Sequence, residues 1–99
     1  MDIKITEIHS MQPDEIKLRF ENKIKHYQNS HLTFISNYSS EWEGNTGYYT
    51  FHIFGTKINA VVNIQTDRVT IESKLQQTAL AQKNIIEELL KNNLKEILR

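Results

Sequence analysis

Between Trp42 and Leu75 the chain contains three runs in which apolar and polar residues alternate, with a short break before each run. The runs cover residues 48–54, 56–64 and 67–75. A period of two is typical of a strand that buries only one of its faces. The first break, Glu43–Gly47, contains two glycines and an asparagine and so favours a tight hairpin. This stretch predicts an antiparallel meander around which the rest of the chain packs.

Two further strands precede the three runs. Asp2–Ile8 alternates Ile3 and Ile5 with polar residues, which is the pattern of a half-buried strand. Leu32–Trp42 is rich in strand-forming residues, and its aromatic positions share one parity. The serines and Asn37 within it interrupt that regularity and predict a bend or a β-bulge.

Two helices are predicted, one on each side of the meander in the sequence. Pro13–Gln28 begins with proline and two acidic residues, which suit a helix start, and repeats apolar residues every three or four positions. Thr78–Leu98 has an apolar face of about half its circumference, wider than a minimal core stripe of roughly 100 degrees. Part of this second apolar face is therefore a candidate for contact with a partner.

The predicted order is strand, helix, four strands, helix. This order indicates an α+β fold, a two-layer sandwich in which both helices cover one face of an antiparallel meander. At 99 residues the chain has the length of a single domain, residues 1–99, with one modest hydrophobic core.

Composition excludes several classes of protein. Twelve basic and twelve acidic residues balance, so no net field favours nucleic acid as a partner. Cysteine is absent, which excludes disulfides and thiolate metal sites. Charges interrupt every apolar run near the start, so neither a signal peptide nor an integral membrane contact is expected. A cytoplasmic location is the default expectation.

Candidate chemistry is sparse. The four histidines, His9, His26, His31 and His52, lack the spacing of metal ligands. The serines and threonines lie in no nucleophile elbow, and the three glycines form no phosphate-binding loop. We therefore expect no catalytic residues, no metal and no cofactor, and a protein that is not an enzyme.

The order of several short motifs resembles the polyhydroxyalkanoic acid system family of small bacterial proteins, encoded near polyhydroxyalkanoate synthesis genes. The resemblance covers nearly the whole chain. It rests on His9-Ser10, Trp42-Glu43-Gly44-Asn45, Tyr49, Phe51, Gly55, the segment from Val69 to Leu75, Lys83, Ile86 and Glu87. It implies a bacterial accessory protein of the polymer system and brings no catalytic residues with it.

Three hypotheses about function follow. The first is a non-enzymatic accessory protein that contacts a polyhydroxyalkanoate granule or its enzymes through Ile85, Leu89 and Leu98, at the flanks of the second helix. The second is a small-molecule carrier with a pocket between helices and sheet, lined by Phe20, Trp42, Phe51 and Ile86. The third is a homodimer that pairs through the outer sheet face around Tyr48 and Val61.

Overall fold

The computed structural model describes residues 3–29, 35–53, 55–76 and 81–99. Its elements occur in the predicted order. They are β1 (Ile3–Ile8), α1 (Pro13–Asn29), β2 (Ile35–Glu43), β3 (Thr46–Ile53), β4 (Thr56–Ile64), β5 (Arg68–Ser73) and α2 (Lys83–Ile97).

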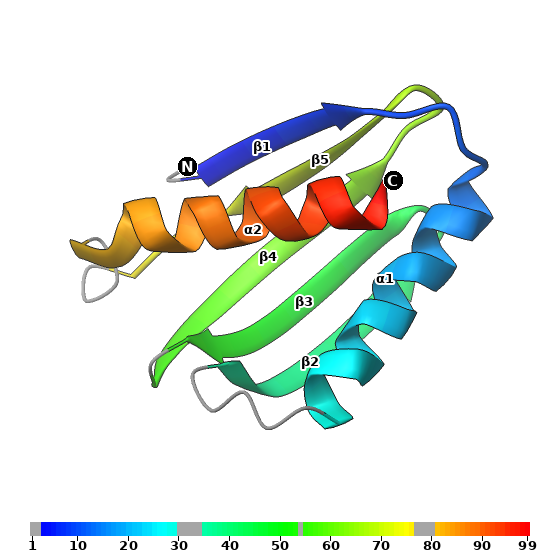
Figure 1. Ribbon diagram of the computed structural model, residues 1–99. Helices are drawn as coiled ribbons and strands as arrows, with labels where there is room; N and C mark the ends of the chain where they lie inside the picture. The colour runs from blue at the N-terminus through cyan, green and yellow to red at the C-terminus, as the bar shows by residue number, and fades with distance from the viewer. Residues whose placement is uncertain (1–2, 30–34, 54, 77–80) are drawn as a thin grey trace.

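The five strands form one sheet in the order β1-β5-β4-β3-β2, and every neighbouring pair is antiparallel. Both helices lie on the same face of this sheet, with α1 over its β2 side and α2 over its β1 side (Figure 1). The predicted α+β sandwich with a meander from β2 to β5 is therefore confirmed. The connection from β1 to β2 through α1 spans the full width of the sheet.

Alternation along the strands separates a buried face from a wetter one, as the sequence predicts. In β4 the residues Ile58, Ala60, Val62 and Ile64 are all buried under the helices. On the opposite face, threonine and asparagine pair across strands, with the Thr50 hydroxyl 3.0 Å from the Asn59 side-chain oxygen. The apolar side chains therefore lie between sheet and helices, where they form one hydrophobic cluster.

The turns follow the chemistry of their residues. Gly44 begins the two-residue connection between β2 and β3 with a φ of 58°, and Gly55 ends the connection between β3 and β4 with a φ of 79°. Positive φ is strained for residues that carry a Cβ, which explains glycine at both positions. The irregularity predicted for β2 is also present, as a shift in its pairing with β3 between Ser36 and Ser39.

The second helix begins later than predicted. The sequence predicts a helix from Thr78, but α2 starts at Lys83, after a single 3₁₀ turn at Ala81 and Gln82. Residues 77–80 lie outside the described part of the chain. Gln82 makes no side-chain capping bond and the first turn of α2 holds no acidic residue, so the usual signals of a helix start are missing. Within the described ranges, no helix has the length and apolarity needed to cross a membrane.

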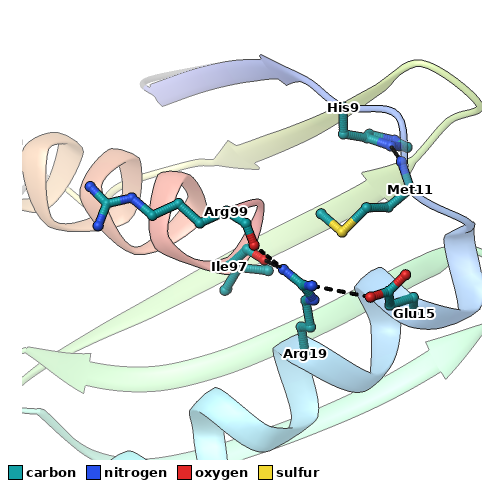
Figure 2. A network of polar contacts seen from close by, with 6 residues as sticks. All are labelled: His9, Met11, Glu15, Arg19, Ile97 and Arg99. Atoms are coloured by element: carbon teal, nitrogen blue, oxygen red, sulfur yellow. Dashed lines mark hydrogen bonds and ion pairs between the residues drawn. The ribbon is translucent and has the colours of Figure 1, made fainter.

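His9 connects the end of β1 to the turn between β4 and β5. Its Nδ1 accepts a hydrogen bond of 3.1 Å from the Met11 backbone N–H, so the neutral ring carries its proton on Nε2. Nε2 then donates to the Gln65 carbonyl at 2.8 Å. The backbone N–H of His9 also donates to the Asp67 carbonyl at 3.0 Å. His9 thus positions the loop from which α1 starts (Figure 2).

Replacing His9 with phenylalanine keeps an aromatic ring but removes both side-chain hydrogen bonds. We expect His9→Phe to lower the free energy of unfolding by about 1–3 kcal/mol, because the Gln65 carbonyl and Met11 N–H lose partners at a partly buried site. Urea denaturation followed by circular dichroism measures the change. The neighbouring exposed substitution Ser10→Ala is the control, and its effect should stay within about 0.5 kcal/mol. Equal stability of the two variants would show that His9 has no such role.

Candidate functional site

A half-open apolar crevice lies between the two helices above the sheet. The helices diverge, and β3 and β4 cross the space between them in Figure 1. The crevice has a volume of about 80 Å³. Its lining residues are Phe20, Lys23, Ile24, Tyr38, Tyr49, Phe51, Ala60, Val62, Ile71, Leu89, Leu90, Asn93, Leu94 and Ile97. A pocket between helices and sheet is therefore present, as the second hypothesis requires.

The smallest side chain of the crevice comes from β4. Ala60 is 4% exposed and lines the crevice opposite Tyr49, its cross-strand partner in β3. The neighbouring crevice residues on the strands, Phe51 and Val62, are larger. Because Ala60 ends at its Cβ, it leaves space where a valine or leucine would fill the core.

Arg19 joins the helices at one end of the crevice. Its guanidinium donates to the Ile97 carbonyl at 2.9 Å and to the Arg99 carbonyl, and a further N–H donates to the Glu15 carboxylate at 3.0 Å (Figure 2). The last carbonyls of a helix have no partners within the helix, so a cation there satisfies them and complements the helix dipole. Arg19 thereby holds the end of α2 against α1.

Polar residues border the crevice at the end where Arg19 joins the helices. The Lys23 ammonium pairs with the Glu96 carboxylate, and the Asn93 amide donates to the Leu89 carbonyl at 2.8 Å. The Lys23–Glu96 pair lowers the pKa of Glu96 below its usual range, through their hydrogen bond first and their charge attraction second. A second, polar groove adjoins the crevice, because both are lined by Lys23 and Ile97.

An aromatic cluster supports the α1 wall of the crevice. The centre of the Trp42 ring lies 6.1 Å from that of Phe20 and 5.8 Å from that of Tyr49, and both contacts are edge to face. Phe20 and Tyr49 form a tilted pair at 6.1 Å. One oxygen of Glu21 accepts from the Trp42 indole N–H at 2.7 Å and from the Tyr49 hydroxyl at 3.2 Å. Hydrogen bonds to a charged acceptor are stronger than neutral ones, so Glu21 fixes α1 to β2 and β3.

Of the four residues predicted to line a pocket, the structure brings two to the crevice. Phe20 and Phe51 line it directly. Trp42 instead packs behind Phe20, and Ile86 is fully buried in the core under α2. Ala60, Leu90 and Asn93 were not predicted as lining residues. A small residue in an otherwise bulky inner row was the available signal for Ala60, whereas the other two depend on how the helices are angled.

The predicted contact residues lie on two different faces. Ile85 is 58% exposed on α2, Leu89 lines the crevice one turn later, and Leu98 is partly buried against the core near the end of α2. Tyr48 and Val61 are cross-strand partners on the outer face of the sheet, where Tyr48 is 45% exposed. The two sets therefore do not form a single surface.

The fold and the crevice define a small α+β protein with a half-open apolar pocket between its helices. The chain matches the family described as "Putative polyhydroxyalkanoic acid system protein" over residues 3–98. The match covers nearly all of the 99 residues, so the chain belongs to this family, and the resemblance seen in the short motifs is confirmed. Comparisons with curated proteins and with solved structures give no match.

Gly47 makes room for the aromatic cluster, and this role is testable. A Cβ built on Gly47 would lie 2.8 Å from the Trp42 ring, closer than atoms tolerate. We expect Gly47→Ala to displace the indole from Glu21 and to lower the free energy of unfolding by about 1–3 kcal/mol. Near-ultraviolet circular dichroism and denaturant titration measure the two effects. Gly47→Ala with an unchanged tryptophan signal would contradict this role.

Because the Tyr49 hydroxyl is buried, we expect the protein to lose stability at alkaline pH. Burial raises the pKa of Tyr49 far above its ordinary value of 10.0, and the Glu21 carboxylate raises it further. Above about pH 10 the unfolded chain therefore releases the Tyr49 proton while the folded chain retains it. The contribution of neutral Tyr49 to the free energy of unfolding is therefore full below about pH 10 and decreases as the pH rises above that value.

The measurement is urea denaturation between pH 9 and pH 11. The midpoint should fall more steeply with pH in the natural protein than in Tyr49→Phe, which has no ionisable group at this position. Tyr48→Phe, on the exposed neighbour, is the matched control and should keep the steep dependence. Parallel curves for all three proteins would refute the assignment.

Proposed function

We propose that the protein is a non-enzymatic accessory protein of a polyhydroxyalkanoic acid system that contacts the surface of the polyester through the apolar edge of α2. Family membership supports the context of the polymer system. The observation that carries the mode of action is the position of Ile85, which is large, apolar and 58% exposed. This proposal commits to the polymer as the partner, and binding to an enzyme of the system is the competing outcome.

The apolar edge of α2 consists of Ile85 and Leu89. The two residues are four positions apart, so they lie on one side of the helix, one above the other. Leu89 lines the crevice and Ile85 continues the same side beyond it. Glu96 also lies on this side and pairs with Lys23 of α1, which shows that this edge of α2 faces the first helix.

The chemistry of the edge matches that of the polymer. A polyhydroxyalkanoic acid is a polyester whose repeating units carry alkyl groups, so its surface exposes apolar chains between ester groups. Burying an isoleucine or leucine side chain against such a surface contributes about 1.5–3 kcal/mol. A single exposed apolar residue is ordinary, but contiguous apolar surface is typical of a contact site, and Ile85 together with Leu89 and the crevice provides such continuity.

The test uses purified protein and particles of a polyhydroxyalkanoate in a sedimentation assay. Ile85→Glu should reduce the affinity for the particles about tenfold or more, because it removes apolar contact and adds a charge. Leu18→Glu is a matched control, since Leu18 is 60% exposed on α1 and lines no part of the crevice. Circular dichroism should show that both variants remain folded.

The outcomes are distinct. Loss of binding in Ile85→Glu with retention in Leu18→Glu supports contact through the α2 edge. Equal loss in both variants would indicate nonspecific adsorption. Absence of particle binding by the natural protein, with capture of a purified polymer synthase instead, would replace the polymer by the enzyme as the partner.

A further inference from the structure

We infer that the crevice is a binding site for one linear alkyl chain of a hydroxyalkanoyl ester, with three or four carbons inside the protein and the ester group at the mouth. The inference deepens the proposed function and rests on it for the class of ligand. The shape, lining and charge of the crevice supply the rest of the argument.

The lining selects an alkyl chain over a polar ligand. Apart from Lys23, Asn93 and the hydroxyls of Tyr38 and Tyr49, the crevice residues present only aliphatic or aromatic groups, and the interior part is formed by buried residues such as Ala60, Val62 and Leu94. A polar group placed there would lose its hydration without gaining partners from these side chains. Apolar pockets with a few polar groups near the entrance are the usual form of a small-molecule site.

The volume limits the length of the chain. An engineered apolar cavity of about 150 Å³ accepts benzene, which has six carbons. By proportion, the crevice of about 80 Å³ accepts three or four. This size excludes an aromatic protein side chain and a whole fatty acid, but it fits the alkyl group of a hydroxyalkanoyl unit of medium length. Longer chains would have to leave the crevice along the open side.

The charges at the mouth favour a neutral ester over a free acid. Lys23 is paired with Glu96, and Arg19 in the adjoining groove is paired with Glu15. Two cations are thus neutralised by two carboxylates, and a third carboxylate would be repelled by Glu96 in particular. An ester carbonyl needs only one hydrogen-bond donor and carries no charge, so it suits this polar border.

Trp42 provides the readout. It is the single tryptophan of the chain, and its ring contacts Phe20, which lines the crevice. Ligand that packs against Phe20 should therefore change the tryptophan fluorescence. The probes are methyl 3-hydroxyalkanoates with alkyl groups of one, three, five and seven carbons, together with the corresponding free acids.

We expect affinity to rise by up to about fourfold per added methylene until the crevice is filled, and then to level off beyond three to five carbons. The esters should bind at least tenfold more tightly than the acids of equal length. Affinity that keeps rising to seven carbons, or that is independent of length, would overturn the assignment to this crevice. Tighter binding of the acids would overturn the neutral-ester part.

Two variants of the crevice make the test specific. Ala60→Val adds two methyl groups inside the crevice and should weaken binding of the five-carbon ester at least tenfold without lowering the melting temperature. Ala81→Val adds the same two groups at an exposed position before α2 and should leave binding unchanged. Val62→Ala enlarges the crevice and should shift the preferred chain length upward by about one carbon, which keeps the test informative if Ala60→Val folds poorly.

The same variants separate this inference from the proposed function. Ile85→Glu should lose binding to polymer particles yet retain the soluble esters, because Ile85 does not line the crevice. If particles bind but no ester does, the crevice assignment fails and the surface contact stands. If esters bind with the expected length dependence but particles do not, the crevice stands and the granule contact fails.

Discussion

Arg19 and the Lys23–Glu96 ion pair join the two helices at the end of α2, and the crevice lies between the helices beside these contacts. The guanidinium satisfies carbonyls at the end of α2 while it is held by Glu15 of its own helix (Figure 2). The helices are close where Arg19 joins them and diverge over β3 and β4 (Figure 1). The apolar volume between them is a consequence of this angle and of the short side chain of Ala60. Arg19 itself does not line the crevice, so its contribution to the pocket is to hold the helix ends together.

The strands and their order along the chain were predictable because their signal is local, whereas the place of β1 beside β5 in the sheet was not predicted. Alternation fixes which residues of β4 and β5 face the helices, and glycines with positive φ fix two of the turns. The crevice was predictable only in part, because its shape depends on the crossing of two helices. No local pattern indicates that Arg19 reaches the end of α2, or that Ile86 is buried while Leu89 is left at an opening. The start of α2 was placed too early because nothing in that segment marks it.

The incomplete packing of the crevice lowers the stability of the fold, which suggests that the crevice has a function. Protein interiors are normally packed as densely as organic crystals. The apolar side chains that line the crevice of about 80 Å³ lack part of this dense packing, which lowers the stability of the fold. A single valine at position 60 would recover part of that stability. A family whose context is an aliphatic polymer offers a reason to keep the space open.

The position of β1 decides when the sheet can be completed. β1 is the first strand of the chain but pairs with β5, so Thr6 meets Thr70 across 64 residues of sequence. The hairpins from β2 to β5 join strands that are neighbours in the sequence, so their pairing closes only short loops. Contacts between distant segments form slowly because the intervening chain must be ordered first. During synthesis, Thr6 of β1 can pair only after Thr70, 64 residues later in the chain, has been added. The β1 edge of the sheet therefore depends on a contact between distant segments, whereas the rest of the sheet is built from neighbours in the chain.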